Sequence, residues 1–189
     1  MLATGGMPSR VSPMTKPPPD RHDVTVTYLE QRAKPRGPAP SRPPFRTAIM
    51  RAHAPPLPFY RYVWNAVGEP HRWVSRRYME DEALAAIVHD DRVAIYVLYK
   101  EGWPAGFAEV DWRQRPLADF KFFGLVPEAQ GSGLGRWFLH EILALIWSAE
   151  PDRVIIETCT LDAPAALRLY QQAGFSVYDQ GRGVIEWRG

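Results

Sequence analysis

The sequence predicts a mixed α/β fold of the α+β kind, with one mostly antiparallel central sheet of about six to seven strands flanked by about four helices. Three observations support this prediction. Short alternating apolar segments are separated by tight turns, a strand, a helix and a buried strand follow one another near the C-terminus, and further segments carry apolar residues at helical spacing. With 46% hydrophobic and 23% charged residues, the 189-residue chain has the composition of a folded domain.

The N-terminal segment sets the expected domain boundary. Residues 1–22 are rich in proline and small residues, so they bury too little apolar surface to offset their ordering entropy. They also lack the apolar core of a signal peptide, and no later segment approaches the length of a membrane span. We expect a flexible tail over residues 1–22 and a single domain over residues 23–189.

The N-terminal half of this domain is expected to hold one strand and two helices. Alternation predicts the strand over residues 23–30, and repeated prolines make residues 35–44 an extended linker. Apolar residues at helical spacing predict a helix over residues 58–67, which Gly68 is placed to end, and a second helix over residues 79–89.

The C-terminal half supplies most of the expected sheet. Three segments joined by short turns predict an antiparallel meander, with strands over residues 93–99, 105–112 and 118–126. A helix over residues 134–147 and a buried strand over residues 153–159 complete a βαβ unit, whose two strands must be parallel. A helix over residues 164–173 and strands over residues 175–178 and 184–187 end the pattern.

A glycine-rich loop, Gln130-Gly131-Ser132-Gly133-Leu134-Gly135, joins the meander to the long helix. The glycines remove side chains where backbone N–H groups converge, and the start of the helix adds a positive dipole, which suits a diphosphate. A P-loop would continue with Lys and then Ser or Thr, whereas Arg136 and Trp137 follow here. A dinucleotide-binding loop usually follows the first strand of its domain, whereas this loop follows several predicted antiparallel strands, which argues against that class. A plain glycine turn is the remaining alternative.

Three motifs, in order and at matching separations, resemble the GNAT superfamily of N-acyltransferases. The superfamily's loop signature is matched by Gln130, Gly133 and Gly135, and its helix-to-strand signature by Ala166, Tyr170, Gly174 and Phe175. The strand before the loop, residues 122–127, is similar to the central strand of that family. The resemblance covers residues 93–189 well and residues 23–91 only in general layout.

The resemblance implies an N-acetyltransferase that transfers an acetyl group from acetyl-CoA to a primary amine of a small molecule or peptide, without a metal. The residues that it places against the cofactor are Leu125, Val126, Gln130, Gly131, Ser132, Gly133, Leu134, Gly135 and Arg136. The pyrophosphate would lie on the loop amides, and the pantetheine arm would extend along the preceding strand. A backbone N–H near Val126 would then stabilise charge on the thioester oxygen.

Attack on the thioester requires a neutral amine, so a carboxylate must remove a proton. Glu109 and Asp119 are the candidates, and Asp119 falls where some relatives carry a glutamate base. The alternatives are an exposed ion pair of Glu109 with Lys121 across the strands, and a solvated carboxylate at Asp119. Tyr170 is implied as the general acid for the departing sulfur, with a core aromatic residue as its alternative.

One departure from the family keeps a second function open. Ala163 stands where many members have an asparagine that binds pantetheine, and the neighbouring Asp162 is expected to cap the next helix. A non-catalytic acyl-CoA-binding sensor or interaction module of the same fold is therefore the alternative to an enzyme.

Composition narrows the partners and the setting. The net charge of +2 is spread along the chain, which argues against a nucleic-acid partner. Cys159 is the only cysteine, as expected for a protein of the reducing cytoplasm, and the excess of arginine over lysine indicates a GC-rich bacterial genome. The residues leave the oligomeric state open, including a homodimer.

Overall fold

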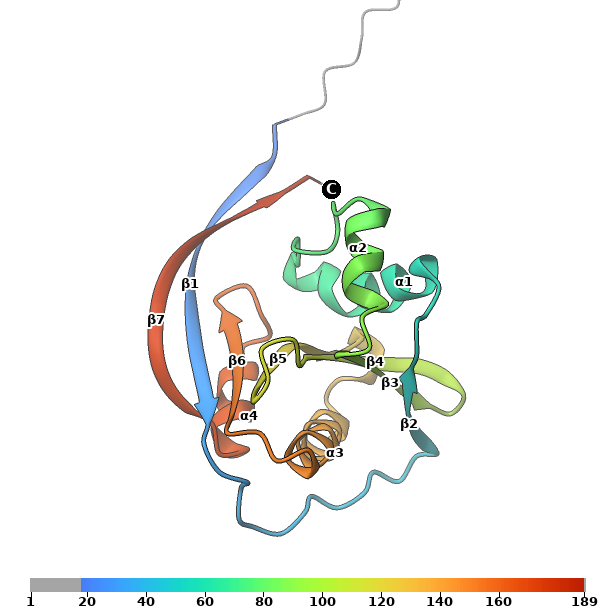
Figure 1. Ribbon diagram of the computed structural model, residues 1–189, viewed down its shortest axis with the longest axis vertical. Helices are drawn as coiled ribbons and strands as arrows, with labels where there is room; N and C mark the ends of the chain where they lie inside the picture. The colour runs from blue at the N-terminus through green and yellow to red at the C-terminus, as the bar shows by residue number, and fades with distance from the viewer. Residues whose placement is uncertain (1–17, 189) are drawn as a thin grey trace, which may run out of the picture.

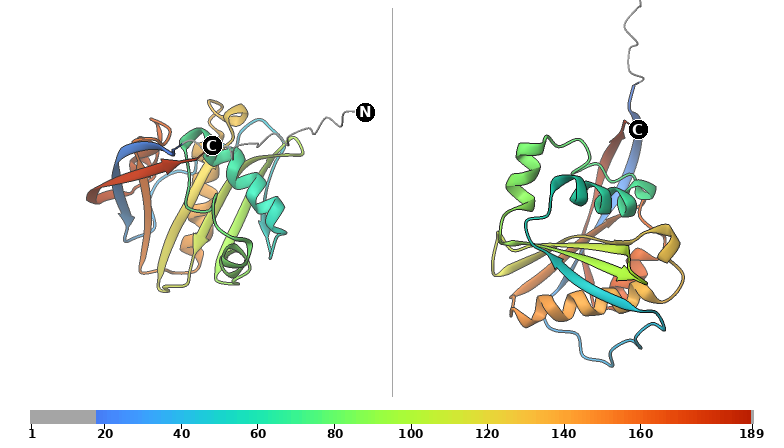
Figure 2. Two further views of the ribbon diagram at one scale, coloured as in Figure 1. Left: turned by 90° about the horizontal axis from the view of Figure 1, so that it is seen from above. Right: turned by 90° about the vertical axis from the view of Figure 1, so that its right-hand side faces the viewer.

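A computed structural model describes residues 18–188 of the chain (Figure 1). Seven strands form one sheet in the order β2-β3-β4-β5-β6-β1-β7. The strands are β1 Asp20–Gln31, β2 Thr47–Ala52, β3 Val93–Lys100, β4 Trp103–Asp111, β5 Leu117–Leu125, β6 Arg153–Cys159 and β7 Ser176–Trp187. The α-helices are α1 Leu57–Gly68, α2 Asp81–Val88, α3 Leu134–Ser148 and α4 Ala166–Gln172. Figure 2 shows α1 and α2 on one face of the sheet and α3 on the other.

The predicted fold class is confirmed, and so is the βαβ unit. β3, β4 and β5 form an antiparallel meander. β5 and β6, which come before and after α3 in the chain, run parallel to each other. Their pairing covers only Leu117 to Asp119 on β5 and Arg153 to Ile155 on β6. Beyond these residues the two strands separate, and the sheet opens in its middle.

Aromatic side chains fill both layers of the core. On one face, Phe123 of β5 packs against Phe138 of α3, with ring centroids 5.2 Å apart. On the other face, Trp64 of α1 meets Phe122 edge-on at 5.7 Å. Burial of each such side chain contributes about 1.5–3 kcal/mol to folding. Leu145 of α3 is 44% exposed and does not belong to this core.

The outer strands differ most from the sequence prediction. β1 begins at Asp20 rather than at residue 23, because its first residues pair with the end of β7, where Asp20 lies opposite Trp187. The last residues assigned to the tail therefore lie in the sheet, while residues 1–17 lie outside the described part of the chain. β7 is one strand instead of two, since Gly181 and Gly183 interrupt the apolar pattern but not the pairing.

β2 was not predicted at all. It is a short edge strand that pairs only with β3, and its side chains are exposed or half-buried. A strand of this kind carries little apolar signal, so the hydrophobic pattern could not reveal it. In the described part of the chain, no helix is long and apolar enough to cross a membrane.

Residues 32–46, here named the strap, join β1 to β2 without regular structure, as the prolines predicted. The strap runs past α3 along the lower side of the molecule in Figure 1. Gln31, which is only 2% exposed, fixes its first end. The amide of Gln31 donates to the carbonyl oxygen of Ala173 at 2.7 Å and accepts a hydrogen bond from the indole of Trp147 at 2.9 Å.

Candidate active site

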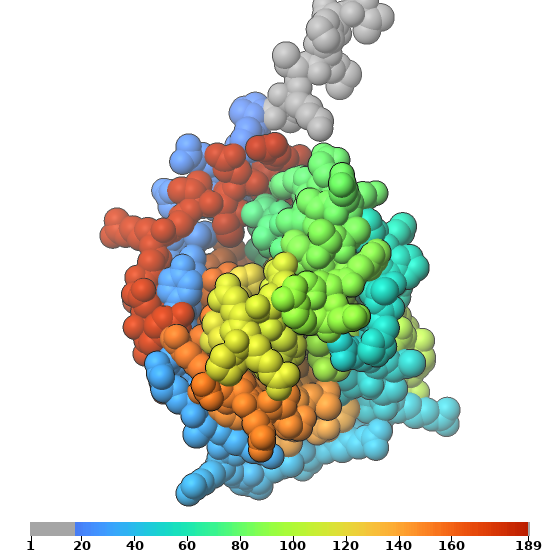
Figure 3. Space-filling view, viewed as in Figure 1, coloured from blue at the N-terminus to red at the C-terminus, as the bar shows by residue number. Residues whose placement is uncertain are grey.

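A cavity of about 490 Å³ lies where β5 and β6 separate. Its walls are formed by β5 and β6, the glycine-rich loop, α4, the facing residues of β1 and β7, and the segment after α1 that carries His71 and Trp73. Figure 3 shows the surface hollowed between β7 and the region of α1 and α2. The volume lies within the range of small-molecule and cofactor sites.

One edge of β5 is open toward this cavity. In an antiparallel ladder, alternate residues face the partner strand, and the N–H of Val126, directly after β5, donates to the carbonyl oxygen of Ala105 in β4 at 3.1 Å. The donor expected near Val126 is therefore not the N–H of Val126 itself, since β4 already takes this donor. By the same alternation, the backbone groups of Phe123 and Leu125 face the gap between β5 and β6.

The glycine-rich loop leads directly into α3. Gly131 and Gly133 have φ angles of +76° and +75°, which other residues rarely adopt, and Gly133 directly precedes α3. The first N–H groups of a helix have no partner within the helix, and here no side chain caps them either. A Cβ atom on either glycine would meet no heavy atom within 4 Å, so the surface above the loop is open. The loop can accept an anion.

The residues assigned to the cofactor separate into groups. Leu125, Gln130, Gly131 and Gly135 line the cavity. Five others do not: Val126 and Leu134 are buried, Gly133 directly precedes α3, Ser132 donates its hydroxyl hydrogen to the carbonyl oxygen of Ala129 at 3.0 Å, and Arg136 lines a second, smaller cavity. The side chain of Gln130 supports the loop by donating to the carbonyl oxygen of Leu125 at 3.3 Å.

Tyr170 of α4 lies in the cavity wall and is 5% exposed. Its ring packs edge-on against Phe123 and Phe175, so the side chain also belongs to the core. No described residue forms a hydrogen bond with its hydroxyl. Burial, and secondarily the charge of Asp162, raises the pKa of the Tyr170 hydroxyl, which therefore stays protonated and able to donate.

Asp162 does not cap α4, so that expectation is wrong. α4 begins after Ala165 without a side-chain cap. One carboxylate oxygen of Asp162 instead accepts from the hydroxyl of Thr158 and the N–H of Cys159, both at 2.8 Å, and the other accepts from the indole of Trp73 at 3.1 Å. Asp162 thus ties β6 to the segment after α1 and places a carboxylate in the cavity wall.

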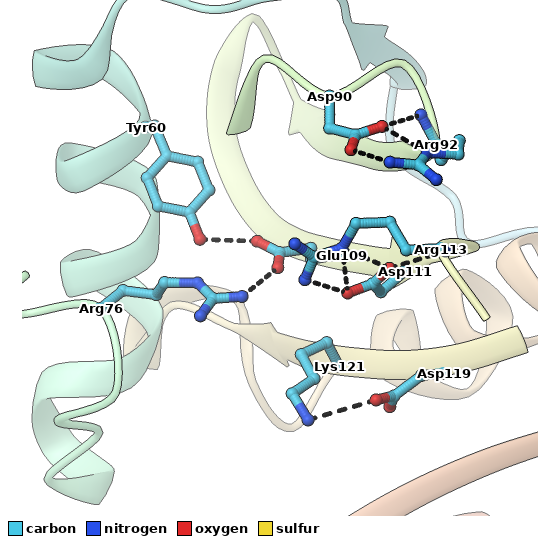
Figure 4. A network of polar contacts seen from close by, with 9 residues as sticks. All are labelled: Tyr60, Arg76, Asp90, Arg92, Glu109, Asp111, Arg113, Asp119 and Lys121. Carbon is cyan, nitrogen blue, oxygen red and sulfur yellow. Dashed lines mark hydrogen bonds and ion pairs between the residues drawn. The ribbon is translucent and has the colours of Figure 1, made fainter. Parts of the chain in front are cut away.

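Glu109 is buried rather than exposed. A bulge in the pairing of β4 with β5 places Glu109 opposite Phe122 and leaves Lys121 without a cross-strand partner, so the expected pair of Glu109 with Lys121 does not form. The carboxylate of Glu109 accepts from the hydroxyl of Tyr60 at 2.6 Å and from the guanidinium of Arg76 at 2.9 Å (Figure 4). Glu109 has no exposed surface, and both of its oxygens are occupied.

The buried cluster of Tyr60, Arg76 and Glu109 connects three elements. Tyr60 comes from α1, Glu109 from β4 and Arg76 from the segment after α1 that also supplies the cavity wall. The guanidinium of Arg76 also lies 5.3 Å from the ring centre of Phe122. Burial alone would lower the pKa of Arg76, but the ion pair with Glu109 raises it, while burial and the charge of Glu109 raise the pKa of Tyr60. Arg76 therefore stays charged, and the hydroxyl of Tyr60 stays protonated.

Asp119 lies on β5 directly opposite Asp111 of β4. It forms an ion pair with Lys121 at 3.2 Å, with 28% of its side chain exposed. Lys121 lines the cavity, whereas Asp119 and Glu109 are not among its lining residues. Of the two predicted bases, Asp119 is thus the one with water access.

Sequence reasoning missed Arg76, Tyr60 and Trp73 as parts of one arrangement. Arg76 and Trp73 lie in an irregular segment where no periodicity indicates which side chains turn inward. Two glycines make room around this arrangement. A Cβ atom on Gly68 would lie 2.4 Å from the ring of Trp73, and a Cβ atom on Gly124 would lie 2.5 Å from the side chain of Val67 in α1. Gly68 was predicted only as the end of a helix.

Comparison with known proteins agrees with the motifs. Residues 91–177 match the family model described as the acetyltransferase (GNAT) domain. A search of curated proteins gave no match.

Solved structures share the fold at low sequence identity. A GCN5-related N-acetyltransferase from Sphaerobacter thermophilus is 16% identical with a TM-score of 0.65, and the alignment covers 92% of this chain and 53% of that one. A conserved protein of unknown function from Staphylococcus epidermidis is 15% identical with a TM-score of 0.54, covering 89% and 63%. This chain thus spans less than two thirds of either. An aminoglycoside acetyltransferase from an uncultured soil metagenomic sample is 15% identical with a TM-score of 0.55, covering 68% and 87%.

Proposed function

We propose that this chain, whose residues 91–177 match the acetyltransferase (GNAT) domain, transfers an acetyl group from acetyl-CoA to a primary amine of a small molecule or peptide. The observation that carries this proposal is the continuity of the open edge of β5 with the glycine-rich loop along one cavity. A thioester that carries a long amide-containing arm and a diphosphate matches this arrangement, because the open strand edge can pair with the amides and the loop N–H groups can bind the diphosphate.

The cofactor would be held mainly by backbone groups. The uncapped N–H groups from Gly133 to Arg136 receive the pyrophosphate at the positive end of α3. The amides of the pantetheine arm pair with the open edge of β5 at Phe123 and Leu125, as an added strand would. A backbone N–H of this edge, in place of that of Val126, then donates to the thioester oxygen as negative charge develops there.

In the proposed reaction, the nitrogen of the neutral amine attacks the thioester carbonyl carbon and forms a C–N bond. The tetrahedral intermediate collapses with cleavage of the C–S bond, and Tyr170 supplies a proton to the departing thiolate. Asp119, through one water molecule, removes the proton that the amine nitrogen loses. The products are the acetylated amine and CoA.

Glu109 has a different role in this proposal. Its two oxygens are occupied by Tyr60 and Arg76, and it lies beneath α1 rather than in the cavity wall. We assign Glu109 as a positioning residue that holds the segment carrying Trp73. Trp73 in turn contacts Asp162 across the cavity.

The acceptor region is mainly apolar with a few acidic groups. Trp73, Phe122, Val24 and Ile185 supply apolar surface, while Asp162 and Glu157 supply carboxylates. Such a surface fits an amine on an apolar body better than a highly charged acceptor.

A non-catalytic acyl-CoA sensor is the second candidate. The observations in its favour are Ala163, at the position of the usual asparagine, and the ion pairs that occupy both predicted bases. It shares the cofactor site and differs only in the absence of transfer.

Thermal unfolding with and without acetyl-CoA tests the common part of both candidates. A ligand at 100 times its Kd adds about 2.7 kcal/mol of stability, which corresponds to a Tm increase of roughly 5–10 °C for a chain of this size. No increase would contradict both. Release of free CoA thiol over a panel of arylalkyl, alkyl and peptide amines then separates them, because the sensor binds acetyl-CoA but transfers to none.

A further inference from the structure

The ends of β1 and β7 extend as a two-stranded ribbon beyond the rest of the sheet. Among the described strands, β6 pairs with β1 only from Val26 onward, so residues 20–24 of β1 and 183–187 of β7, here named the ribbon, pair only with each other. Gly181, which pairs with Val26, and Gly183 lie in β7 where β6 ends. An isolated pair of strands is marginally stable in water, so the ribbon needs a further contact to keep its place.

The ribbon forms one wall of the cavity. Val24, Gly183 and Ile185 line the cavity from this side. His71 and Trp73 line the facing wall, from the segment after α1. The glycine-rich loop leads into α3, on the opposite face of the sheet from α1 and α2 (Figure 2). Because the proposed cofactor occupies that loop, the amine is left the side between the ribbon and the segment after α1.

Trp187, at the end of the ribbon, bridges these two walls. The guanidinium carbon of Arg77 lies 4.3 Å from the ring centre of Trp187, and that of Arg72 lies 5.6 Å from it. Asp20, which pairs with Trp187 across the ribbon, forms an ion pair with Arg72 at 3.4 Å. These four residues, here named the latch, hold the ribbon against the segment after α1. Figure 3 shows the end of β7 next to the region of α1 and α2, above the hollow.

Arg77 gives the latch a fixed base at the end of α1. Its guanidinium donates to the side-chain oxygen of Asn65 at 3.0 Å and forms an ion pair with Glu69 at 3.4 Å. A neighbouring contact acts in parallel, because the backbone N–H of Arg188 donates to the hydroxyl oxygen of Tyr78 at 2.8 Å. The end of β7 is therefore held by a few contacts at the surface, outside the apolar core.

We propose that the latch sets the size of the amine that reaches the cavity, with Trp187 as the residue that determines this specificity. The inference rests on the proposed function, because it concerns the amine side of that reaction. A slender amine enters through the hollow beside the closed latch. A branched or polycyclic amine enters only when the ribbon moves away from the segment after α1, and Gly181 and Gly183 let β7 bend where it leaves β6.

Loss of the Trp187 ring should open the latch by a measurable factor. A cation–π contact at an exposed site contributes a factor of about 2 to 5, so the loss of both makes the open form roughly 5- to 30-fold more populated. The ion pair of Asp20 with Arg72 adds little, because their side chains are 57% and 36% exposed.

Cys159 reports access to the cavity directly, since it is the only cysteine of the chain and lines the cavity. N-ethylmaleimide and N-pyrenylmaleimide modify a thiol by the same chemistry and differ in size. In Trp187→Ala, the rate of Cys159 modification by the pyrenyl reagent should rise about 5- to 30-fold, while the rate with the ethyl reagent should change less than about twofold.

Three further variants sharpen this measurement. Arg72→Gln weakens the latch from the opposite wall, so it should raise the pyrenyl rate by about 2- to 5-fold. Trp187→Phe keeps an aromatic ring and should stay near the unaltered rate. The matched control is Trp103→Ala, because Trp103 is 37% exposed, has the ammonium of Lys100 at 5.8 Å from its ring centre and lies outside the cavity lining. It should change neither rate.

Acetyl transfer gives the second readout. In Trp187→Ala, the ratio of kcat/KM for a branched or polycyclic amine to that for a slender amine should rise by about the same 5- to 30-fold, with the KM for acetyl-CoA nearly unchanged.

Each outcome has a separate meaning. An unchanged pyrenyl rate in both Trp187→Ala and Arg72→Gln would overturn the latch and leave the proposed function standing. Equal acceleration of both maleimides would show a general loosening of the fold and would also overturn it. If the chain transfers to no amine while the pyrenyl rate alone still rises, the proposed function fails and the latch stands as the control of entry to the cavity.

Discussion

Removal of the Glu109 carboxylate should destabilise the fold strongly. In Glu109→Ala, the guanidinium of Arg76 stays buried without its partner, and the hydroxyl of Tyr60 loses its acceptor. The side chains of Arg76 and Glu109 are 9% and 0% exposed, so solvent screening does not reduce the loss. An unpaired buried charge costs about 3–5 kcal/mol, and the lost hydroxyl hydrogen bond adds about 1–3 kcal/mol.

The total, about 4–8 kcal/mol, is a large part of the 5–15 kcal/mol that stabilises a typical domain. We take the lower half of that range, because the ring of Phe122 lies 5.3 Å from the guanidinium and compensates part of its charge. Urea unfolding followed by fluorescence of the seven tryptophans measures the change. The control is Glu186→Ala, which removes an exposed ion pair with Arg188 and should change stability by less than about 1 kcal/mol.

A double variant separates the positioning role of Glu109 from a catalytic one. Replacing both charges, in Arg76→Met/Glu109→Met, should restore most of the stability, since paired removal of buried ions is often neutral. If Glu109 only positions the cavity wall, this variant regains acetyl transfer as well. A stability loss below about 1 kcal/mol in Glu109→Ala would refute the buried ion pair. A stable but inactive double variant would instead assign Glu109 as the base.

Tyr170→Phe should lower kcat by about 10²- to 10⁴-fold with little change in the KM for acetyl-CoA, because it removes only the proton donor, and steady-state kinetics with an accepted amine would check this. An unchanged kcat would leave Tyr170 as a core residue. The raised pKa of Tyr170 also affects stability at alkaline pH. The folded state keeps its proton while the unfolded tyrosine releases it near pH 10, so stability should fall as the pH rises above about 10, by up to about 1.4 kcal/mol per pH unit for this group. Urea midpoints from pH 9 to 11 should fall less steeply in Tyr170→Phe, and identical slopes would count against the shift.

Elements with strong local signals were predicted well from the sequence. The apolar run of β6 and the periodic face of α3 identify those elements almost to the residue, and the glycine-rich loop leads directly into α3, as expected. The loop signal is strong because its conformation depends on a few adjacent residues. The predicted sheet order around the βαβ unit likewise follows from the parallel pairing that such a unit requires.

Features that depend on register and tertiary contact could not be read from the sequence. A single-residue bulge at Lys121 changes which residue faces Glu109, and no residue type marks it. The partners of Asp162 come from β6 and from Trp73, far along the chain, while a local rule predicted a helix cap. In both cases, pairing or packing between elements decided the contact, and a rule that reads only neighbouring residues does not include it.

The place of β1 in the sheet has a consequence for biosynthesis. Among the described strands, β1 comes before all others in the chain, yet its neighbours are β6 and β7, which follow the meander, with Val26 opposite Cys159 and Asp20 opposite Trp187. The meander of β3, β4 and β5 has only short connections and can pair early. β1 can pair only after β6 and β7 have emerged, and the strap that follows β1 has no fixed place until then. The walls of the cavity therefore come together only after β6 and β7 have been made, later than the meander.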